Sequence, residues 1–357
     1  MRHWVACIVA LAVVGPRPAR ADELALAFVG DVMFGRYVAD GFAPIAAEAV
    51  DPFASVAPVI QAADLAFANL ETPVMAAPPP TSPYGVRMRF VATPARLATV
   101  AAAGFDVVSL ANNHSYDMRA AGVAETPGHV AAAGLQAIGA AMAADPIRVA
   151  TIARAGWRVG VVAATTVRNG SQRQGQPLLP FVEERDLAAT VAPLVAAARA
   201  DHDLVVVVMH WGVEYADQPS RRLVAAARAM IDAGADAVVG GHPHVLQPIE
   251  RYRHGVIAYS LGNFLFDNTR AIERQTGILT LRYTRAATRG CLDHAAFAPA
   301  LIDRRPLHHP SLATDRRGTI VRTRLRTLSA ARPFATTWTE APGAPGTLRV
   351  DGPCAAP

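Results

Sequence analysis

Two short polar motifs carry most of the chemical information in this sequence. Residues 240–244 are Gly-Gly-His-Pro-His, and residues 111–114 are Ala-Asn-Asn-His. Each motif follows a run of apolar or β-branched residues that is typical of a buried strand. Polar groups at the carboxyl ends of strands converge at one edge of a sheet, where α/β proteins build their sites. Imidazole, amide and carboxylate groups gathered there suit borderline divalent metals, so we expect a metal centre with one or two ions.

Three histidines are the strongest candidates for metal ligands. His242 and His244 are separated by one residue, so both side chains point the same way if the loop is extended. The preceding Gly240 and Gly241 permit a close approach of the backbone. His210 ends the most hydrophobic run of the chain, where an imidazole without a partner is costly to bury. A core histidine with its hydrogen bonds satisfied is the alternative for His210.

Carboxylates follow two further predicted strands. Asp31 comes directly after residues 24–29 and could ligate a metal, or it could cap a following helix. Glu71 comes directly after residues 65–70, and its two oxygens could bridge two ions. A surface position is the alternative for Glu71. Both carboxylates would reach the edge of the sheet where the histidines are expected.

The Asn112-Asn113-His114 motif is a more specific signal than either carboxylate alone. An amide oxygen is a weak metal ligand, which suits Asn113 if the site already carries enough negative charge. His114 could then contact the substrate, while Asp117 could bond the far ring nitrogen and raise the basicity of the imidazole. Two asparagines that form a cap or a turn are the alternative.

Other titratable residues fall outside these motifs. Glu214 could orient His210 or a neighbouring ligand, although a solvent-facing side chain is the simpler interpretation. The remaining histidines have no comparable setting, and we expect them on the surface; they are His129, His202, His254, His294, His308 and His309.

Alternating strand and helix patterns must position these groups. The order of β-α units with added strand pairs predicts an α/β domain with mixed sheets. Predicted strands cover residues 24–29, 65–70, 107–110, 149–153, 158–163, 203–209, 237–240, 256–260 and 277–284. Predicted helices cover residues 52–64, 94–104, 119–134, 186–200 and 220–234. Residues 168–177 are a candidate lid or surface loop, and residues 341–357 are expected to form a loose tail.

The composition bounds the class of protein. The chain has 357 residues, enough for one large domain or two smaller ones, and a net charge of +5. Its arginines are scattered, whereas a nucleic-acid binder would be expected to cluster them on one face, so we expect no nucleic-acid partner. Dinucleotide-binding, P-loop and nucleophile-elbow fingerprints do not occur in the sequence.

The N-terminus is typical of a secretory signal peptide. Arg2 and His3 precede an apolar run over residues 4–15 that is too short to span a bilayer, and residues 19–21 match a cleavage site. We therefore expect residues 1–21 to be removed and the protein to be exported to the periplasm or the exterior. In such an oxidising compartment, Cys291 and Cys354 could form a disulfide or remain free thiols.

Taken in order, the motifs resemble the CapA/PgsA-type family, which is named for poly-γ-glutamate capsule biosynthesis. The resemblance covers roughly residues 24–285, and six motifs in one order are far more specific than any one alone. The motifs are Gly30-Asp31, Asn69-Leu70-Glu71, Asn112-Asn113-His114, His210-Trp211-Gly212 with Glu214, Gly241-His242-Pro243-His244 and Ser260-Leu261-Gly262-Asn263-Phe264.

This resemblance implies the calcineurin-like metallophosphoesterase fold, an α/β fold with a two-sheet sandwich flanked by helices. The implied ligands are Asp31, Glu71 and His244 for a first ion, and Glu71, Asn113, His210 and His242 for a second. His114 would be the acid or the contact to the transition state. General metallophosphoesterases have an Asp-x-His motif where this chain has Met33, and a thioether is a poor ligand for hard or borderline ions. The first site is therefore expected to be weaker than usual.

The resemblance also leads to expectations for the domain boundaries and the function of the chain. We expect a signal peptide (1–21), a domain of the family type (22–300) and a C-terminal extension with a Pro-, Gly- and Ala-rich tail (301–357). The leading hypothesis is an exported hydrolase that uses Mn, Zn, Fe or Mg to cleave a phosphoester, or an amide of an acidic polymer such as poly-γ-glutamate. A capsule-synthesis membrane complex is an expected partner. The alternative hypothesis is a non-catalytic, metal-containing component that binds the polymer or assists its export.

Overall fold

A computed structural model of the chain describes residues 22–38, 41–45, 50–81, 89–141, 146–169, 178–286 and 289–355. The predicted signal peptide (1–21) and most of the candidate lid (170–177) lie outside the described residues. Among the described helices, none combines the length and the apolar character that a membrane crossing requires.

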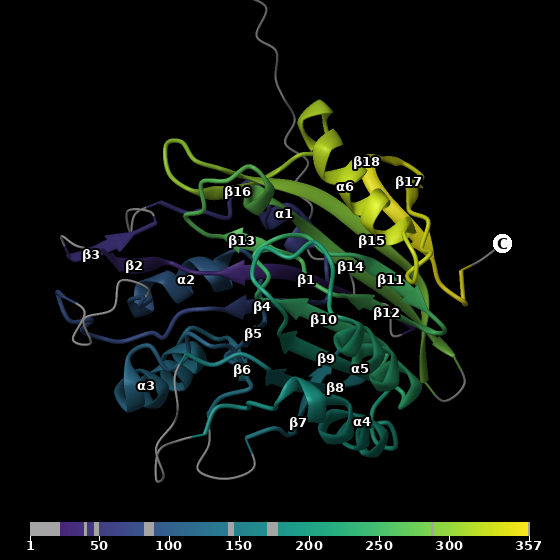
Figure 1. The fold of residues 1–357 in the computed structure, drawn as a ribbon, viewed down its shortest axis with the longest axis horizontal. Helices are drawn as coiled ribbons and strands as arrows, with labels where there is room; N and C mark the ends of the chain where they lie inside the picture. Colours follow the sequence, from purple (N-terminus) through teal and green to yellow (C-terminus); the bar gives the residue numbers. More distant parts are fainter. Residues whose placement is uncertain are drawn as a thin grey trace, which may run out of the picture.

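The larger sheet joins a parallel half to an antiparallel half (Figure 1). Its strands are β1 (Glu23–Val32), β4 (Leu65–Leu70), β5 (Val107–Ser109), β6 (Gln136–Ile138), β13 (Asn263–Leu265), β14 (Gln275–Ala286), β15 (Arg289–Asp303), β16 (His309–Leu312), β17 (Thr339–Ala341) and β18 (Ala344–Asp351). Their order is β17-β18-β15-β14-β1-β4-β5-β6, with β13 beside β1 and β16 beside β15. Strands β1, β4, β5 and β6 are parallel, whereas β14, β15, β18 and β17 alternate in direction.

The smaller sheet has a parallel centre with an antiparallel strand at each edge. Its order is β11-β12-β10-β9-β8-β7. These strands are β7 (Val149–Arg154), β8 (Trp157–Thr165), β9 (Leu204–His210), β10 (Ala237–Gly241), β11 (Ile249–Tyr252) and β12 (Gly255–Ala258). A separate hairpin is formed by β2 (Gly35–Val38) and β3 (Gly41–Pro44).

The two sheets pack face to face because their strands alternate between two apolar surfaces. In β1, Leu26 and Phe28 belong to a core between the sheets that also contains Val161 and Val206. Ala27 in the same strand belongs to a second core, on the outer face of the larger sheet. Successive residues of a strand point to opposite faces, so one apolar run such as β1 serves both cores.

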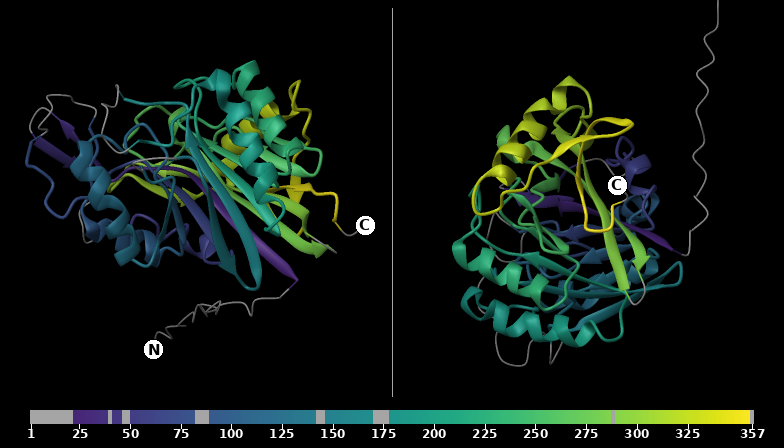
Figure 2. Two further views of the ribbon diagram at one scale, coloured as in Figure 1. Left: turned by 90° about the horizontal axis from the view of Figure 1, so that it is seen from below. Right: turned by 90° about the vertical axis from the view of Figure 1, so that its right-hand side faces the viewer.

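Helices cover the outer faces of both sheets (Figure 2). The outer core of the larger sheet includes residues of α1 (Ala57–Ile60), α2 (Pro94–Ala102) and α3 (Arg119–Ala132). The outer core of the smaller sheet includes residues of α4 (Leu187–Ala198) and α5 (Arg221–Asp232), and α6 (Thr319–Ala330) packs against β11 and β15. Short 3-10 turns lie at Glu184–Asp186, Ile272–Arg274 and Arg316–Gly318. The predicted two-sheet α/β sandwich flanked by helices is confirmed.

Two predictions for individual elements are wrong. Residues 52–64 form only one helical turn, α1, within a series of turns; Pro58 lies in its first turn and Asp51 Oδ1 accepts the Phe53 N–H (2.8 Å) just before it. The expected loose tail instead contains β18, which pairs with β15 and buries Leu348 in the core between the sheets. Cys291 and Cys354 form a disulfide that ties the end of β18 to β15. The Pro-, Gly- and Ala-rich composition of this segment did not indicate a strand. A few apolar residues are enough to form one here, because the neighbouring strand β15 supplies the backbone hydrogen bonds.

Candidate metal centre

The predicted ligands converge at the carboxyl ends of parallel strands from both sheets. Figure 1 shows β1, β4, β9 and β10 directed toward the same edge of the molecule. Asp31 lies near the end of β1, Glu71 directly follows β4, His210 ends β9, and His242 and His244 follow β10. Asn113 and His114 lie in the loop after β5, and all seven of these side chains are buried. The strands therefore bring together groups that are far apart in the sequence.

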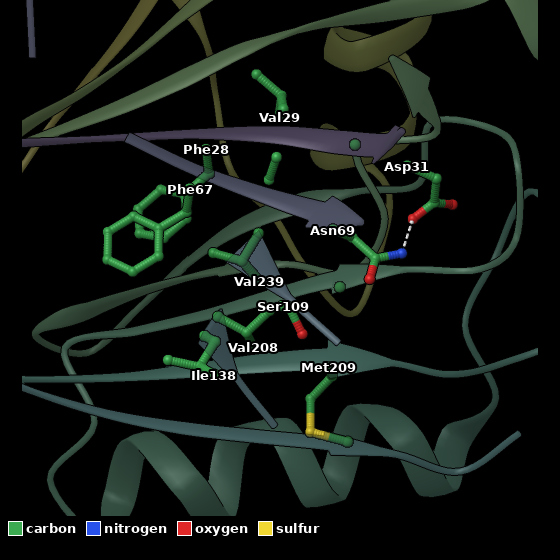
Figure 3. A pocket seen from close by; sticks show the side chains of 14 residues that line it. Phe28, Val29, Asp31, Phe67, Asn69, Ser109, Ile138, Val208, Met209 and Val239 are labelled. Carbon is green, nitrogen blue, oxygen red and sulfur yellow. Dashed lines mark hydrogen bonds between the residues drawn. The ribbon is translucent and has the colours of Figure 1, made fainter. Parts of the chain in front are cut away.

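Asp31 is held by a neighbouring amide and by the backbone of the histidine loop. Its Oδ1 accepts a hydrogen bond from Asn69 Nδ2 at 2.8 Å, which Figure 3 shows, and its Oδ2 accepts one from the His242 N–H at 3.1 Å. His244 Nδ1 lies 3.6 Å from Oδ2. Burial raises the pKa of Asp31, and the charge of His244 opposes that rise. A Cβ at Gly241 would lie 2.4 Å from Asp31 Oδ1, so only glycine permits this approach.

A small cavity lies between the two sheets directly beside Asp31 (Figure 3). Asp31 and Asn69 lie at one end of it, while Phe28 and Phe67 line the other end. These rings stack with a centroid distance of 4.8 Å. The apolar wall lowers the local dielectric, so charged groups at this edge interact strongly with one another.

Glu71 has the most unusual environment in the centre. It is 0% exposed, and neither carboxylate oxygen has a hydrogen-bond partner among the described residues. Its Oε1 lies 3.7 Å from His210 Nε2 and 3.8 Å from His114 Nε2. Burial, followed by the charge of Asp31, raises the pKa of Glu71 well above its usual range. A buried carboxylate without partners is costly, and a bound cation would remove that cost.

His210 is kept neutral and is oriented from both sides. Its Nε2 lies 2.8 Å from Asn113 Oδ1, and its Nδ1 lies 3.2 Å from Asn69 Nδ2. Burial, followed by the charge of His242, lowers the pKa of His210 well below its usual range. The neutral imidazole is the form that binds metals. The amide of Asn113 and the imidazole of His210 thus present an oxygen and a nitrogen side by side.

The two histidines after β10 converge by a route that the sequence did not predict. The loop is not extended, because His242 and His244 have left-handed backbone conformations with φ of 93° and 58°. Such conformations are strained in residues other than glycine and occur preferentially at functional sites. His242 Nδ1 is buried and has no hydrogen-bond partner in the described segments, and burial lowers the pKa of His242 to about 3. His244 Nδ1 is fixed by Asn263 Oδ1 at 2.8 Å, which leaves Nε2 for another partner.

His114 is held mainly by Asp117. Its Nδ1 lies 2.7 Å from Asp117 Oδ2, which also accepts the Phe90 N–H at 2.7 Å. Arg89 Nη1 donates to Asp117 Oδ1 at 3.1 Å. The His114 ring stacks on Phe90 with a centroid distance of 3.8 Å. These contacts fix the orientation of the ring and direct Nε2 toward Glu71.

The donor set fits a divalent cation. Ligand atoms of Asp31, Glu71 and His244 lie within 4.8 Å of one another, as do those of Glu214, His242 and His244. The first group contains the residues expected to hold the first ion. Glu214 is exposed, yet it reaches the same histidines from the solvent side. Within the described part of the chain, the Glu71 oxygens and His242 Nδ1 have no hydrogen-bond partner, so they can serve as ligand atoms for such an ion.

Met33, the residue expected to weaken the first metal site, is fully buried in the outer core of the larger sheet. The histidines assigned to the surface lie outside the centre and are all partly exposed.

Sequence reasoning missed the residues that position the ligands. Asn69 contacts Asp31 and His210 together, and Asn112 Nδ2 in turn donates to Asn69 Oδ1 at 3.0 Å. Asn263 fixes His244. All three asparagines lie in the motifs that carried the family resemblance, which was the available signal for a role at the centre.

A cleft of about 350 Å³ opens beside His114 and His244. Its walls also include Arg36, Phe90, Tyr215 and Phe266. The centre is therefore accessible to a ligand larger than water.

The sequence matches a known family and several known proteins. The family described as "Bacterial capsule synthesis protein PGA_cap" matches residues 25–268. Capsule biosynthesis protein CapA of Bacillus anthracis is 35% identical over 260 residues, which cover 69% of this chain and 60% of that protein. PGA biosynthesis protein CapA of Bacillus subtilis (strain 168) is 35% identical over 255 residues, which cover 69% and 64%. The match thus spans less than two thirds of the length of these two relatives.

Solved structures with lower similarity were also found. A hypothetical protein from Thermus thermophilus has 16% identity and a TM-score of 0.43, and the match covers 77% of this chain and 98% of that one. The 5'-nucleotidase from Candida albicans SC5314 has 11% identity and a TM-score of 0.43, and the match covers 74% of this chain and 48% of that one.

Proposed function

The chain belongs to the bacterial capsule synthesis family PGA_cap, and from this premise we propose that it is an exported, metal-dependent hydrolase-like protein of poly-γ-glutamate capsule biosynthesis. Its substrate would be a phosphoester, or an amide of an acidic polymer. The names of the Bacillus relatives refer to capsule and PGA biosynthesis, which supports the acidic polymer as the substrate.

One observation carries the proposal. Glu71 is a fully buried carboxylate whose oxygens have no hydrogen-bond partner, and it faces the imidazoles of His210 and His114. A carboxylate that served only the fold would be paired, as the buried Glu250 is with Arg228 and Tyr259. The surroundings of Glu71 are therefore best explained by a role as a ligand of a cation.

Two sets of ligands are proposed. Asp31, Glu71 and His244 would hold one ion, and Glu71, Asn113, His210 and His242 would hold a second, with Glu71 bridging. The mixture of nitrogen and oxygen donors suits Mn, Zn, Fe or Mg. A divalent ion bound there would supply Lewis acidity, which polarises the target bond and lowers the pKa of an attacking water.

The protein's own residues would orient the substrate and move a proton. Asp117 accepts from Nδ1 of His114 and so directs Nε2 into the centre. In its imidazolium form, His114 would donate the Nε2 proton to the leaving group, with Asp117 as the orienting partner. Stacking on Phe90 holds the ring in place during this transfer. The catalytic roles thus fall to His114 and Asp117.

Location and partners are also proposed from the sequence. Residues 1–21 would be removed on export, residues 22–300 would form the domain of the family type, and residues 301–357 would be its extension. A capsule-synthesis membrane complex is the proposed assembly partner, since the family is named for that process. The C-terminal extension would travel with the domain, because β18 and the Cys291–Cys354 disulfide join it to β15.

A non-catalytic role is the second candidate. Met33 occupies the position where general metallophosphoesterases place a histidine ligand, and it is buried among apolar side chains. A first ion held by fewer nitrogen donors would be bound more weakly. The protein would then use its metal to capture carboxylates of the polymer rather than to cleave it.

Metal analysis and hydrolysis assays on the exported protein test the proposal. Protein recovered outside the cytoplasm should contain at least one divalent ion, and His210→Ala should lower the metal content. The metal-loaded protein should hydrolyse bis(4-nitrophenyl) phosphate or shorten poly-γ-glutamate, and chelation should abolish the activity. Bound metal without turnover on either substrate would favour the binding role. A metal-free protein with unchanged behaviour in chelator would reject both roles.

A further inference from the structure

Arg36 occupies a position in the cleft that the proposed ligands and catalytic residues leave unexplained. It lies on β2, and its guanidinium forms part of the wall beside His114 and His244. Its side chain is only 18% exposed, so this cation is largely removed from bulk water. A charge placed in such surroundings interacts with a ligand more strongly than a charge at the rim.

Two aromatic rings connect Arg36 to His114 and His244. The Arg36 guanidinium carbon lies 5.2 Å from the centre of the Phe90 ring and 5.9 Å from that of Phe266. Phe90 stacks on His114 at 3.8 Å, and the Phe266 ring lies 4.9 Å from that of His244. The rings hold the guanidinium in place through cation–π contacts.

Phe90 contacts both Arg36 and His114, so a substrate group bound at Arg36 would lie next to the reacting centre.

Arg36 forms an ion pair with an acidic residue of the cleft. The pair joins Arg36 Nη2 to Asp267 Oδ1, and Asp267 also lines the cleft. A guanidinium has five N–H donors in a rigid fork that matches the two oxygens of a carboxylate or the oxygens of a phosphate. An anionic group of a substrate could therefore share this fork with Asp267 or compete with Asp267 for it.

The second arginine of the cleft is less suited to selective recognition. The side chain of Arg270 is 60% exposed, and its Nη1 pairs with Glu273 at 2.9 Å. Its guanidinium carbon lies 5.1 Å from the centre of the Tyr215 ring. Contacts to an exposed charge are screened by solvent and salt, so Arg270 would contribute less to affinity.

We propose that Arg36 is the specificity-determining residue of the cleft, where its guanidinium binds a carboxylate or phosphate group of the substrate beside the scissile bond. This inference rests on the proposed function, because it assumes that an anionic substrate enters the cleft. For a γ-linked glutamate polymer, the group bound would be the α-carboxylate adjacent to the γ-amide. For a phosphoester, it would be a phosphate oxygen.

A purely structural ion pair is the competing explanation. Arg36 and Asp267 join the β2–β3 hairpin to the segment after β13, and that link alone could account for their pairing. The two explanations differ in what happens when Asp267 is replaced. Asp267→Asn breaks the ion pair but retains the guanidinium, whereas Arg36→Gln breaks the same pair and removes the guanidinium.

The test measures binding of two probes to the full-length mature protein by calorimetry. The probes are a short γ-linked oligoglutamate and phenyl phosphate, which separate a carboxylate site from a phosphate site. Arg36→Gln should weaken the preferred probe by about ten- to a hundredfold, the usual range for a lost charged hydrogen bond. Asp267→Asn should bind that probe as tightly as the wild type or more tightly. Arg253→Gln, which removes an exposed charge paired with Asp232, controls for net charge and should bind normally.

Each outcome bears on a different claim. Equal losses in Arg36→Gln and Asp267→Asn would show that the pair is structural and overturn the inference. So would wild-type affinity in Arg36→Gln, and in both cases the proposed function would stand, because the wild type still binds. A wild type that binds neither probe would overturn the inference and the proposed anionic substrate together. If Arg36→Gln does not fold, Arg36→Lys keeps the charge without the planar fork and should bind about tenfold more weakly.

Discussion

Carboxylates at the amino ends of the parallel strands have different partners from those at the carboxyl ends. At the amino ends, four aspartates each lie directly before a strand. The carboxylate of each accepts a hydrogen bond from a backbone N–H of the neighbouring strand. The pairs are Asp64 with Ala25 (2.8 Å), Asp106 with Ala66 (2.9 Å), Asp203 with Arg158 (2.7 Å) and Asp236 with Val205 (2.7 Å). Arginine side chains contact three of these carboxylates as well, namely those of Asp106, Asp203 and Asp236.

At the carboxyl ends, the carboxylates of Glu71 and Asp31 have other surroundings. Among the described residues, the Glu71 carboxylate has no hydrogen-bond partner, and Asp31 is approached by His244 and His210 rather than by arginine. The comparison indicates that carboxylates at the amino edge complete the sheet, whereas Glu71 and Asp31 at the carboxyl edge have surroundings that suit an external ligand. We therefore expect substitutions at the amino ends of the strands to change stability, and substitutions at the carboxyl ends to change turnover or metal binding.

The largest effect on stability is expected at the amino edge. Asp236 is 3% exposed, and its Oδ2 accepts from Arg199 Nη1 and from the Val205 N–H, both at 2.7 Å. Asp236→Ala leaves both donors without an acceptor and should lower the free energy of unfolding by about 3–5 kcal/mol. Denaturant unfolding with and without chelator should show the same loss. Asp64→Ala, which frees only the Ala25 N–H, should cost about 1 kcal/mol. If the loss in the free energy of unfolding depended on metal, the proposed difference between the two edges of the sheet would be wrong.

His114→Ala should show the reverse pattern at the carboxyl edge. The variant lacks the proposed acid, so turnover should fall by about 100-fold or more. Asp117 keeps its bonds to Arg89 and to the Phe90 N–H, so folding should change little. Metal content should also remain near the wild-type value, as measured by elemental analysis. His129→Ala, on α3 outside the centre, is the matched control. If the His114 variant lost its metal, His114 would be a ligand and not the acid.

The buried glutamates Glu71 and Glu250 offer a direct comparison. At metal concentrations about a hundredfold above Kd, a bound ion should add about 2.7 kcal/mol to the stability of the wild type. Glu71→Gln should lose most of this increment. Without metal the variant should be as stable as the wild type or more so, because the substitution removes the desolvation cost of the carboxylate. Glu250→Gln weakens bonds to Arg228 and Tyr259 and should destabilise equally with and without metal. Thermal unfolding of both variants distinguishes the two kinds of site.

Much of this layout could be predicted because buried parallel strands are continuous apolar runs. Residues 65–70 and 203–209 were predicted as strands, and β4 and β9 occupy nearly the same positions. The residue that ends each run is polar, so the edge of the sheet where the ligands meet was also predictable. Local sequence carries this information because each strand is buried on both faces.

Elements held by distant neighbours were not predictable in this way. Strand β15 mixes Asp, His and Pro with apolar residues, and its pairing with β14 and β18 supplies what the local pattern lacks. The helix α6 does carry a helical pattern, since its buried Val321, Leu325 and Leu328 are spaced by four and three residues. Arginines between them obscured it.

The residues that orient the ligands were missed for a related reason. Asn69 joins Asp31 to His210, and these contacts depend on sheet pairing that no single motif specifies. The φ values of His242 and His244 were likewise inaccessible, because the strain is tolerated only where the surrounding structure enforces it. Motif reasoning identified residues that converge at this edge but could not show how they are held.

The smallest expected effect is a pH dependence confined to the amino edge. Burial raises the pKa of Asp236 to about 6, against the opposing charge of Arg199. The unfolded chain has the lower pKa, so the native state holds more protons between the two values, and stability falls as pH rises. Relative to Asp236→Asn, which cannot ionise, the wild type should lose about 1 kcal/mol between pH 5 and pH 7. Because the metal centre is the same in both proteins, its own titration cancels in this difference. Denaturant unfolding at matched pH values measures it. If the difference instead grew in favour of the wild type as pH rose, Arg199 and the Val205 N–H would outweigh burial, and Asp236 would be a fully compensated carboxylate.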